Sequence, residues 1–373
     1  MNTATQNENN TIYLAHKIEI RPTDEQRTYL SKCCGIRRFM YNQCVNNFII
    51  NYDPNEKYTK TKVNEFYKQI KSEYEWFGEV TSRAARVATE DFMTSMDRYF
   101  KGTSKKPTFK KKGRSNESFS LRETNKFKVN ERTLKIEKLK TPIKLRQKLR
   151  LIGKPKQVTI STKAGKWFVS ILVEITELPK PIDYSTRKPS VGIDMGIKDL
   201  AVLSDGTVFP ALNALKSKQN KLSKLQRKLA KQERGSNAYI RTKLKIQKLH
   251  FYVVKQRDAI LHEISDYVTE HYNLITIENL NIKVMVRNRK LSRAISDVGF
   301  GKLRQFIEYK SLLRGNNLVL ADRFFPSSKM CSGCGMIHNM PLHIRTMNCD
   351  CGLILDRDLN AAINLNNYGL LYK

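Results

Sequence analysis

The sequence reads FFPSSKMCSGC at residues 324–334 and CDCGLILDRDLNAA at residues 349–362. Two cysteine pairs at tight spacing, about the length of a β-hairpin apart, are typical of a closed tetrahedral zinc site with a structural role. The predicted ligands of one Zn²⁺ are Cys331, Cys334, Cys349 and Cys351. An acidic cluster and an apolar, helix-forming run follow at once, so the predicted zinc site lies directly beside a second candidate site.

The remaining cysteines and the histidines of this segment are interpreted differently. His338 and His343 lie between the two cysteine pairs, and we interpret them as surface residues or nucleic-acid contacts because four thiolates complete the zinc shell. Cys33, Cys34 and Cys44 fall in a helical pattern and are predicted to be small buried thiols. This cysteine usage fits a reducing cytoplasm.

Three carboxylates lie at positions where packing does not explain an acidic residue. Asp194 and Glu278 each end a short apolar run, and Asp358 opens a helical run. Singly, they could be a turn residue, a strand-end cap and a helix N-cap. Together, in so basic a chain, they predict a catalytic site that holds two divalent cations, and Mg²⁺ suits such a site because it takes few carboxylates. Asp356 is interpreted as a helix cap or a secondary ligand.

The composition indicates a polyanionic partner. Lys and Arg number 68 against 35 Asp and Glu, a formal net charge of +33, which favours association with nucleic acid or an anionic membrane. The sequence has no run of about eighteen apolar residues to span a bilayer and no signal-peptide pattern at its polar start, so we predict nucleic acid as the partner and no membrane association. Clustered loop cations are the usual phosphate contacts. Those predicted in one loop are Lys105, Lys106, Lys110, Lys111, Lys112 and Arg114.

The first half of the chain predicts a small β-barrel interrupted by a helical bundle. Residues 12–21 alternate as a strand does, and Thr23 with Gln26 forms a capping box that begins a helix. Residues 118–174 return to short alternating strands. The helices predicted between these strands span residues 23–46, 61–74 and 81–100.

The second half predicts buried strands alternating with helices. The predicted strands span residues 189–194, 200–203, 207–209, 274–278 and 317–321. Residues 212–268 predict two long basic helices divided at Gly235-Ser236, and further helices are predicted at 300–314 and 358–371. An opening meander of this kind is consistent with an RNase H-like sheet.

Several stretches resemble the TnpB family of insertion-sequence-encoded, RNA-guided DNA endonucleases, regarded as ancestral to type V CRISPR effectors. They are GIRRFMYN (35–42), GIDMG (192–196), LQR (225–227), QRD (256–258), ENLN (278–281), RNRKLSRAISD (287–297), ADRFFPSSK (321–329) and residues 356–364. The chain departs from the family pattern at Phe300, Met330 and Leu355. None of these departures touches the three acids.

The resemblance implies an α+β multidomain fold. The implied parts are an OB-like wedge β-barrel at 1–22 and 115–180, a helical recognition bundle at 23–114, a RuvC nuclease domain of RNase H-like α/β fold at 186–325 and 353–373 that includes the basic helices 212–268, and a Cys₄ zinc-ribbon insert at 326–352. Asp194, Glu278 and Asp358 would be the catalytic acids that hold two Mg²⁺.

The resemblance also implies partners and an activity. The partners would be a guide RNA from the end of the element and a double-stranded DNA target with a short flanking motif, in the nucleoid of a prokaryotic cell; one chain or two could bind. It adds Arg227, Arg257, Arg287 and Arg289 to the predicted nucleic-acid contacts. Two alternatives are an RNA-guided DNA-binding repressor without cleavage, against which the intact acids argue, and a transposase that performs strand transfer.

Overall fold

The computed structural model describes residues 11–51, 58–113, 115–176, 188–212, 214–288, 291–341 and 343–372. The chain divides into two compact units, Asn2–Thr176 and Glu177–Lys373. None of the described helices is both long and apolar enough to cross a membrane.

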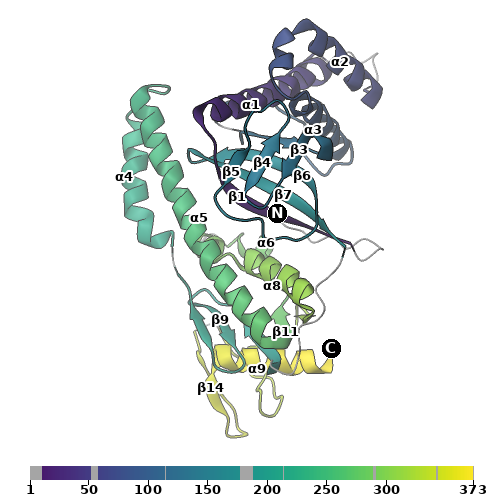
Figure 1. Ribbon diagram of the computed structural model, residues 1–373. Helices are drawn as coiled ribbons and strands as arrows, with labels where there is room; N and C mark the ends of the chain where they lie inside the picture. Colours follow the sequence, from purple (N-terminus) through teal and green to yellow (C-terminus); the bar gives the residue numbers. More distant parts are fainter. Residues whose placement is uncertain are drawn as a thin grey trace. The chain divides into compact units, whose positions relative to one another are not determined.

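The first unit is a seven-stranded antiparallel sheet into which a set of helices is inserted (Figure 1). The sheet is barrel-like and nearly closed, in the order β2-β6-β7-β1-β5-β4-β3. Its strands are β1 (Ile12–Arg21), β2 (Ser118–Leu121), β3 (Phe127–Val129), β4 (Thr133–Ile136), β5 (Ile143–Leu145), β6 (Lys154–Lys163) and β7 (Lys166–Ile175). The inserted α-helices are α1 (Asp24–Val45), α2 (Lys60–Glu73) and α3 (Arg83–Phe100). The predicted succession of strand, helices and strands is therefore confirmed.

The start of α1 follows the predicted chemistry. The Thr23 side chain accepts a hydrogen bond of 3.3 Å from the Gln26 backbone, and the Gln26 side chain accepts one of 3.0 Å from the Thr23 backbone, so two backbone donors at this helix end are satisfied. Cys33, Cys34 and Cys44 are buried as predicted. Their burial raises the pKa of each thiol.

The second unit is built on a five-stranded mixed sheet in the order β10-β9-β8-β11-β12. Strand β11 pairs in parallel with β8 and β12, whereas β9 is antiparallel to both β8 and β10. The strands are β8 (Lys188–Asp194), β9 (Asp199–Leu203), β10 (Val208–Pro210), β11 (Tyr272–Glu278) and β12 (Asn317–Ala321), with a separate pair β13 (Thr346–Asn348) and β14 (Ile354–Asp356). The α-helices are α4 (Gln219–Ala230), α5 (Asn237–His271), α6 (Ile282–Met285), α7 (Ser292–Val298), α8 (Phe300–Arg314) and α9 (Arg357–Leu371).

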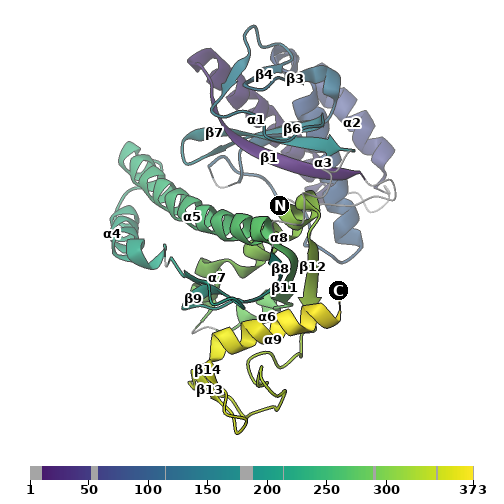
Figure 2. The same cartoon turned by 60° about the horizontal axis from the view of Figure 1, so that its bottom comes forward.

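Helices cover both faces of this sheet (Figure 2). On one face, Val191 and Ile193 of β8 pack in a core with Leu261 of α5 and Leu303 of α8. On the other face, α9 contacts β8 and β11. Because both faces are buried, β8 and β11 are nearly continuous apolar runs, as expected for parallel strands.

Candidate carboxylate and zinc sites

Two of the predicted acids end neighbouring parallel strands. In the pairing of β8 with β11, Ile193 lies opposite Ile277. The next residues, Asp194 and Glu278, therefore lie side by side at the carboxyl edge of the sheet. This edge is the usual place for ligand sites in open α/β sheets.

Helix α9 brings the third acid to the same edge. A Cβ on Gly192 would lie 2.0 Å from the carbonyl oxygen of Ala362 and 2.3 Å from the backbone nitrogen of Asn366. The helix thus lies directly on the backbone of β8, which only glycine permits. Asp358 stands one turn before Ala362, in the first turn of α9, so this close approach sets where its carboxylate lies.

Asp194 interacts electrostatically with each of the other two carboxylates. Burial, and then the negative charges of Glu278 and Asp358, raise the pKa of Asp194 well above its ordinary value. Burial also raises the pKa of Glu278, and a 2.6 Å hydrogen bond donated by the Ser327 hydroxyl acts in the opposite direction. Like charges disfavour each other's ionised form unless a cation compensates them. The structure thus places Asp194 within electrostatic range of both other predicted acids.

Asp356 is the cap of α9. Its Oδ1 accepts hydrogen bonds from the backbone N–H of Asp358 at 2.8 Å and of Leu359 at 3.3 Å. Of the two roles considered for Asp356, the structure shows the helix cap, which fixes the first turn that carries the third acid.

Arg345 belongs to this site and was missed by the sequence reasoning. Its guanidinium forms an ion pair with Asp358, whose side chain is 17% exposed. Its charge also lowers the pKa of Asp194, after that of Arg357. In a chain with 68 basic residues, nothing local to Arg345 distinguishes it.

Two buried asparagines of α9 hold the loop that precedes the cysteines. Asn364 Nδ2 donates to the carbonyls of Ser327 at 2.8 Å and Met330 at 2.6 Å. Asn360 donates to the Met330 carbonyl at 2.7 Å and accepts from the Ser332 backbone at 2.9 Å. The helix thereby positions both the serine that contacts the second acid and the first cysteine loop. The asparagines lie in the quoted stretch 356–364, but their role appears only in three dimensions.

The four predicted zinc ligands gather beside α9. All four cysteine sulfurs lie within 4.8 Å of one another, with 3.6 Å between Cys331 and Cys351 and 3.5 Å between Cys334 and Cys349. A tetrahedral site with Zn–S bonds of about 2.3 Å separates its sulfurs by about 3.8 Å. A glycine with positive φ, +80° or +91°, follows each cysteine pair and turns the backbone. The donor set and its spacing fit zinc.

His338 differs from the surface residue that the sequence suggested. It is half-buried, and its Nε2 lies 3.2 Å from the Cys349 sulfur, which places it against the cluster without joining the four sulfurs. His343 is exposed, as predicted.

The predicted nucleic-acid contacts have varied surroundings. Those with exposed side chains are Lys105, Lys106, Lys111, Lys112, Arg227 and Arg287. Arg114 and Arg289 lie outside the described residues. Contact of the exposed side chains with nucleic acid stays a prediction.

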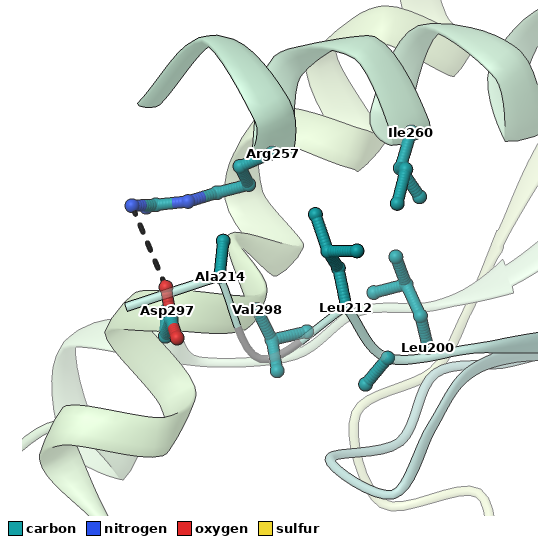
Figure 3. Close-up of a pocket in the computed structure, with 8 residues that line it drawn as sticks. Leu200, Leu212, Ala214, Arg257, Ile260, Asp297 and Val298 are labelled. Atoms are coloured by element: carbon teal, nitrogen blue, oxygen red, sulfur yellow. Dashed lines mark ion pairs between the residues drawn. The ribbon is translucent and has the colours of Figure 1, made fainter. Parts of the chain in front are cut away.

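Lys110 and Arg257 are half-buried and also have partners within the protein. The Lys110 ammonium lies 3.4 Å from the centre of the Tyr41 ring, and burial lowers the pKa of Lys110 to about 8. Arg257 donates a 2.8 Å hydrogen bond to the Ser296 carbonyl and lies 3.7 Å from the Asp297 carboxylate, at the rim of a cavity of about 20 Å³ (Figure 3). Each of these two cations thus has a partner inside its own unit, and its contact with phosphate stays a prediction.

Comparison with known proteins gives the family. Residues 170–289 match a family described as "Probable transposase", residues 300–365 one described as "Cas12f1-like, TNB domain", and residues 10–57 one described as "Helix-turn-helix domain". A Streptomyces pristinaespiralis protein named "Putative RNA-guided DNA endonuclease" is 32% identical over 95% of this chain and 89% of its own length. Further relatives are named TnpB-like proteins. The chain belongs to the TnpB family.

Other TnpB relatives and a solved structure extend this finding. An Escherichia coli (strain K12) protein named "Putative RNA-guided DNA endonuclease InsQ" is 29% identical over 86% of this chain and 83% of its own. The solved "Cas12f1-sgRNA-target DNA complex" contains a chain with a TM-score of 0.51 and 15% identity, aligned over 92% of this chain and 83% of that chain. At this identity the likeness concerns the fold alone.

Proposed function

We propose that this TnpB-family chain is an RNA-guided DNA endonuclease that hydrolyses phosphodiesters with Asp194, Glu278 and Asp358. The observation that carries the proposal is that Asp194 and Glu278 end adjacent parallel strands, and that the charges of Glu278 and Asp358 both raise the pKa of Asp194. The names of the relatives from Streptomyces pristinaespiralis and Escherichia coli supply the reaction class. A strand order of β10-β9-β8-β11-β12, with only β8, β11 and β12 parallel, supports a RuvC domain of RNase H fold.

The carboxylate group fits Mg²⁺. Carboxylate oxygens are the ligands that this ion prefers, and a buried acid with a raised pKa, such as Asp194, has an ionised form that lacks compensation from the protein. Two bound Mg²⁺ would supply an activated water and stabilise the leaving oxygen. The chain's own contribution is to hold Asp194 and Glu278 on rigid strands, to fix Asp358 through α9, and to keep Glu278 oriented through Ser327.

The remaining parts follow from the same proposal. Zn²⁺ on the four cysteines would hold the insert 326–352 beside α9, and the excess charge of +33 would hold a guide RNA and its double-stranded DNA target by their phosphates. The proposed domains are the wedge barrel at 1–22 and 115–180, the recognition bundle at 23–114, and the RuvC domain at 186–325 and 353–373.

The test is purification of the full chain from cells that also express RNA from its native locus. The co-purified RNA is sequenced, and the sample is incubated with Mg²⁺ and a plasmid that matches the RNA, beside an Asp194→Ala control. A discrete RNA and cutting that the substitution abolishes would support the proposal. A discrete RNA with DNA binding but no cutting would favour the repressor, and joined strands in place of cut ends would favour strand transfer.

A further inference from the structure

Helices α4 and α5 form a hairpin whose outer part does not pack on the sheet. The ion pair of Lys302 with Asp258 marks where α8 begins to run beside α5. Helix α4 has no buried residue, and within residues 237–255 of α5 only Thr242 and Val253 are buried. Figures 1 and 2 both show α4 lying beside this outer part of α5.

The outer part of the hairpin reaches past the edge that carries the acids. The start of α8 lies at the Glu278 end of β11, because Arg304 donates a 2.8 Å hydrogen bond to Asn279, and it lies level with Asp258 through Lys302. Helix α5, which passes directly into β11, therefore runs antiparallel to the strand. The 35 residues of α5 span about 52 Å, whereas the seven residues of β11 span about 23 Å. Residues 237–255 therefore extend roughly 28 Å beyond the Glu278 end of the strand.

A regular seam joins the two helices. Its residues repeat at intervals of three and four, as in antiparallel packed helices, and are half-buried or buried. They are Leu222, Leu225 and Leu229 on α4, Gln232 two residues after its end, and Thr242, Ile246, Leu249, Val253 and Gln256 on α5.

One face of the hairpin is almost entirely basic. It consists of the residues that precede each seam residue, and in an antiparallel pair the same offset on both helices lies on the same side. We call this set the basic face: Lys221, Lys224, Lys228, Lys231, Arg241, Lys245, Lys248, Tyr252 and Lys255. All nine are exposed, and eight of them are cations.

The opposite face is not basic in this way. It consists of the residues that follow each seam residue: Ser223, Gln226, Ala230, Glu233, Lys243, Gln247, His250, Val254 and Arg257. Only two of these are Lys or Arg, and Arg257 is already paired with Asp297. A merely solvated surface would not sort charge by face. Like charges three and four residues apart also destabilise a helix, and a negatively charged partner would relieve this repulsion on the basic face.

We propose that the basic face holds the guide–target duplex by its phosphates as it approaches the acids. This inference rests on the proposed function, and it assigns one surface to one of the partners. Two parallel rows of cations suit the two backbones of a duplex, and an RNA–DNA duplex is held through its backbone. Surfaces for single strands stack bases on several aromatic rings, whereas this face presents only Tyr252, 51% exposed.

The experiment compares three full-length proteins loaded with guide RNA: the native chain, the variant K224Q/K228Q/K231Q, and the same variant carrying Q226K/A230K/Q247K. The third protein has the same net charge as the native chain, but its three added lysines lie on the opposite face, at positions that are also exposed. Affinity for a matched target is measured without divalent cations as a function of salt. A synthetic RNA–DNA duplex and the guide RNA alone are each also titrated against protein free of guide RNA, so that these arms report on the face even if no guided cutting exists.

Affinity falls as salt rises, and the basic-face variant should make this fall less steep. The magnitude of the slope of log affinity against log salt should decrease by about 2–3, which is about 0.7–0.9 for each phosphate that is no longer neutralised. The transferred charges should not restore it, and melting temperatures should agree among the three proteins. Full restoration by the opposite face would overturn the proposal, as would an unchanged slope. Equal losses for guide RNA alone and for the duplex would assign the face to the guide RNA and overturn the assignment to the duplex.

Discussion

Substitution of Gly192 by alanine tests the packing that positions the third acid. The new Cβ would lie 2.0 Å from the Ala362 carbonyl oxygen and 2.3 Å from the Asn366 nitrogen, whereas ordinary contact begins at 3.4 Å. Both obstacles are backbone atoms, so no side-chain rotation relieves them. Helix α9 must therefore retreat by more than 1 Å from β8, and Asp358 must retreat with it.

The expected effects are large on both stability and cleavage. Overpacking typically costs about 1–3 kcal/mol, and a backbone clash belongs at the upper end. At about 2–4 °C for each kcal/mol in a domain of this size, the melting temperature should fall by about 6–12 °C. A displacement of 1 Å at a reacting group can cost about 10²-fold in rate, so single-turnover cleavage at a temperature where G192A is folded should fall by about that factor.

A matched control is available in the first unit. A Cβ on Gly35, within α1, would meet nothing within 4 Å, and G35A should therefore be neutral or stabilise by up to about 1 kcal/mol. Native melting and native cleavage in G192A would refute the argument that the contact of α9 with β8 positions Asp358. A loss of stability with an unchanged cleavage rate would show that the contact stabilises the fold but does not position Asp358 for cleavage.

Further predictions concern the same helix and its neighbours. A Cβ on Gly369 would lie 1.8 Å from Thr276 Oγ1, so G369A should destabilise, and T276A should recover most of that loss in a double-mutant melting cycle; additive losses would contradict this. S327A removes the hydrogen bond that lowers the pKa of Glu278, so the acid limb of the pH–rate profile should move to higher pH, and an unmoved limb would argue against the contact. Since Asp194 has a raised pKa in the folded state, its ionised form destabilises the metal-free protein at pH 7; D194N should raise the melting temperature without Mg²⁺, with the gain vanishing as pH falls to about 4. Chelation of zinc should lower the melting temperature of the native chain, and atomic absorption should find one zinc released per chain. A metal-free protein with the native melting temperature would contradict a structural role for zinc.

The features that could be predicted from the sequence are those that depend on short local patterns of residues. Short apolar runs predicted the sheet strands, and the cysteine spacing predicted a cluster that the structure brings together. Asp194 and Glu278 could be placed near each other because parallel strands end at one edge. Asp358 required more, since only the glycine of β8 and the helix it admits set its position.

The parts that sequence could not predict depend on long-range contacts. Arg345 is one cation among many until the fold places it on Asp358. Lys110 lies in a loop of exposed lysines, and its inward position depends on the Tyr41 ring. The predicted division of the basic helices at Gly235-Ser236 is confirmed, since Ser236 caps α5 at Asn237, but sequence did not show that α4 already ends at Ala230. The signal for the basic face was present in the sequence, but it requires the antiparallel hairpin to be recognised.

The contact of Gly192 with α9 also bears on how the chain folds. It joins backbone segments about 170 positions apart, and closing so long a loop is entropically costly before native contacts compensate for it. We therefore expect α9 to dock on β8 late in folding. Until it does, Asp358 is not in place beside the other two acids, so cleavage should be the last property to appear during refolding, after zinc uptake and after most of the helical signal.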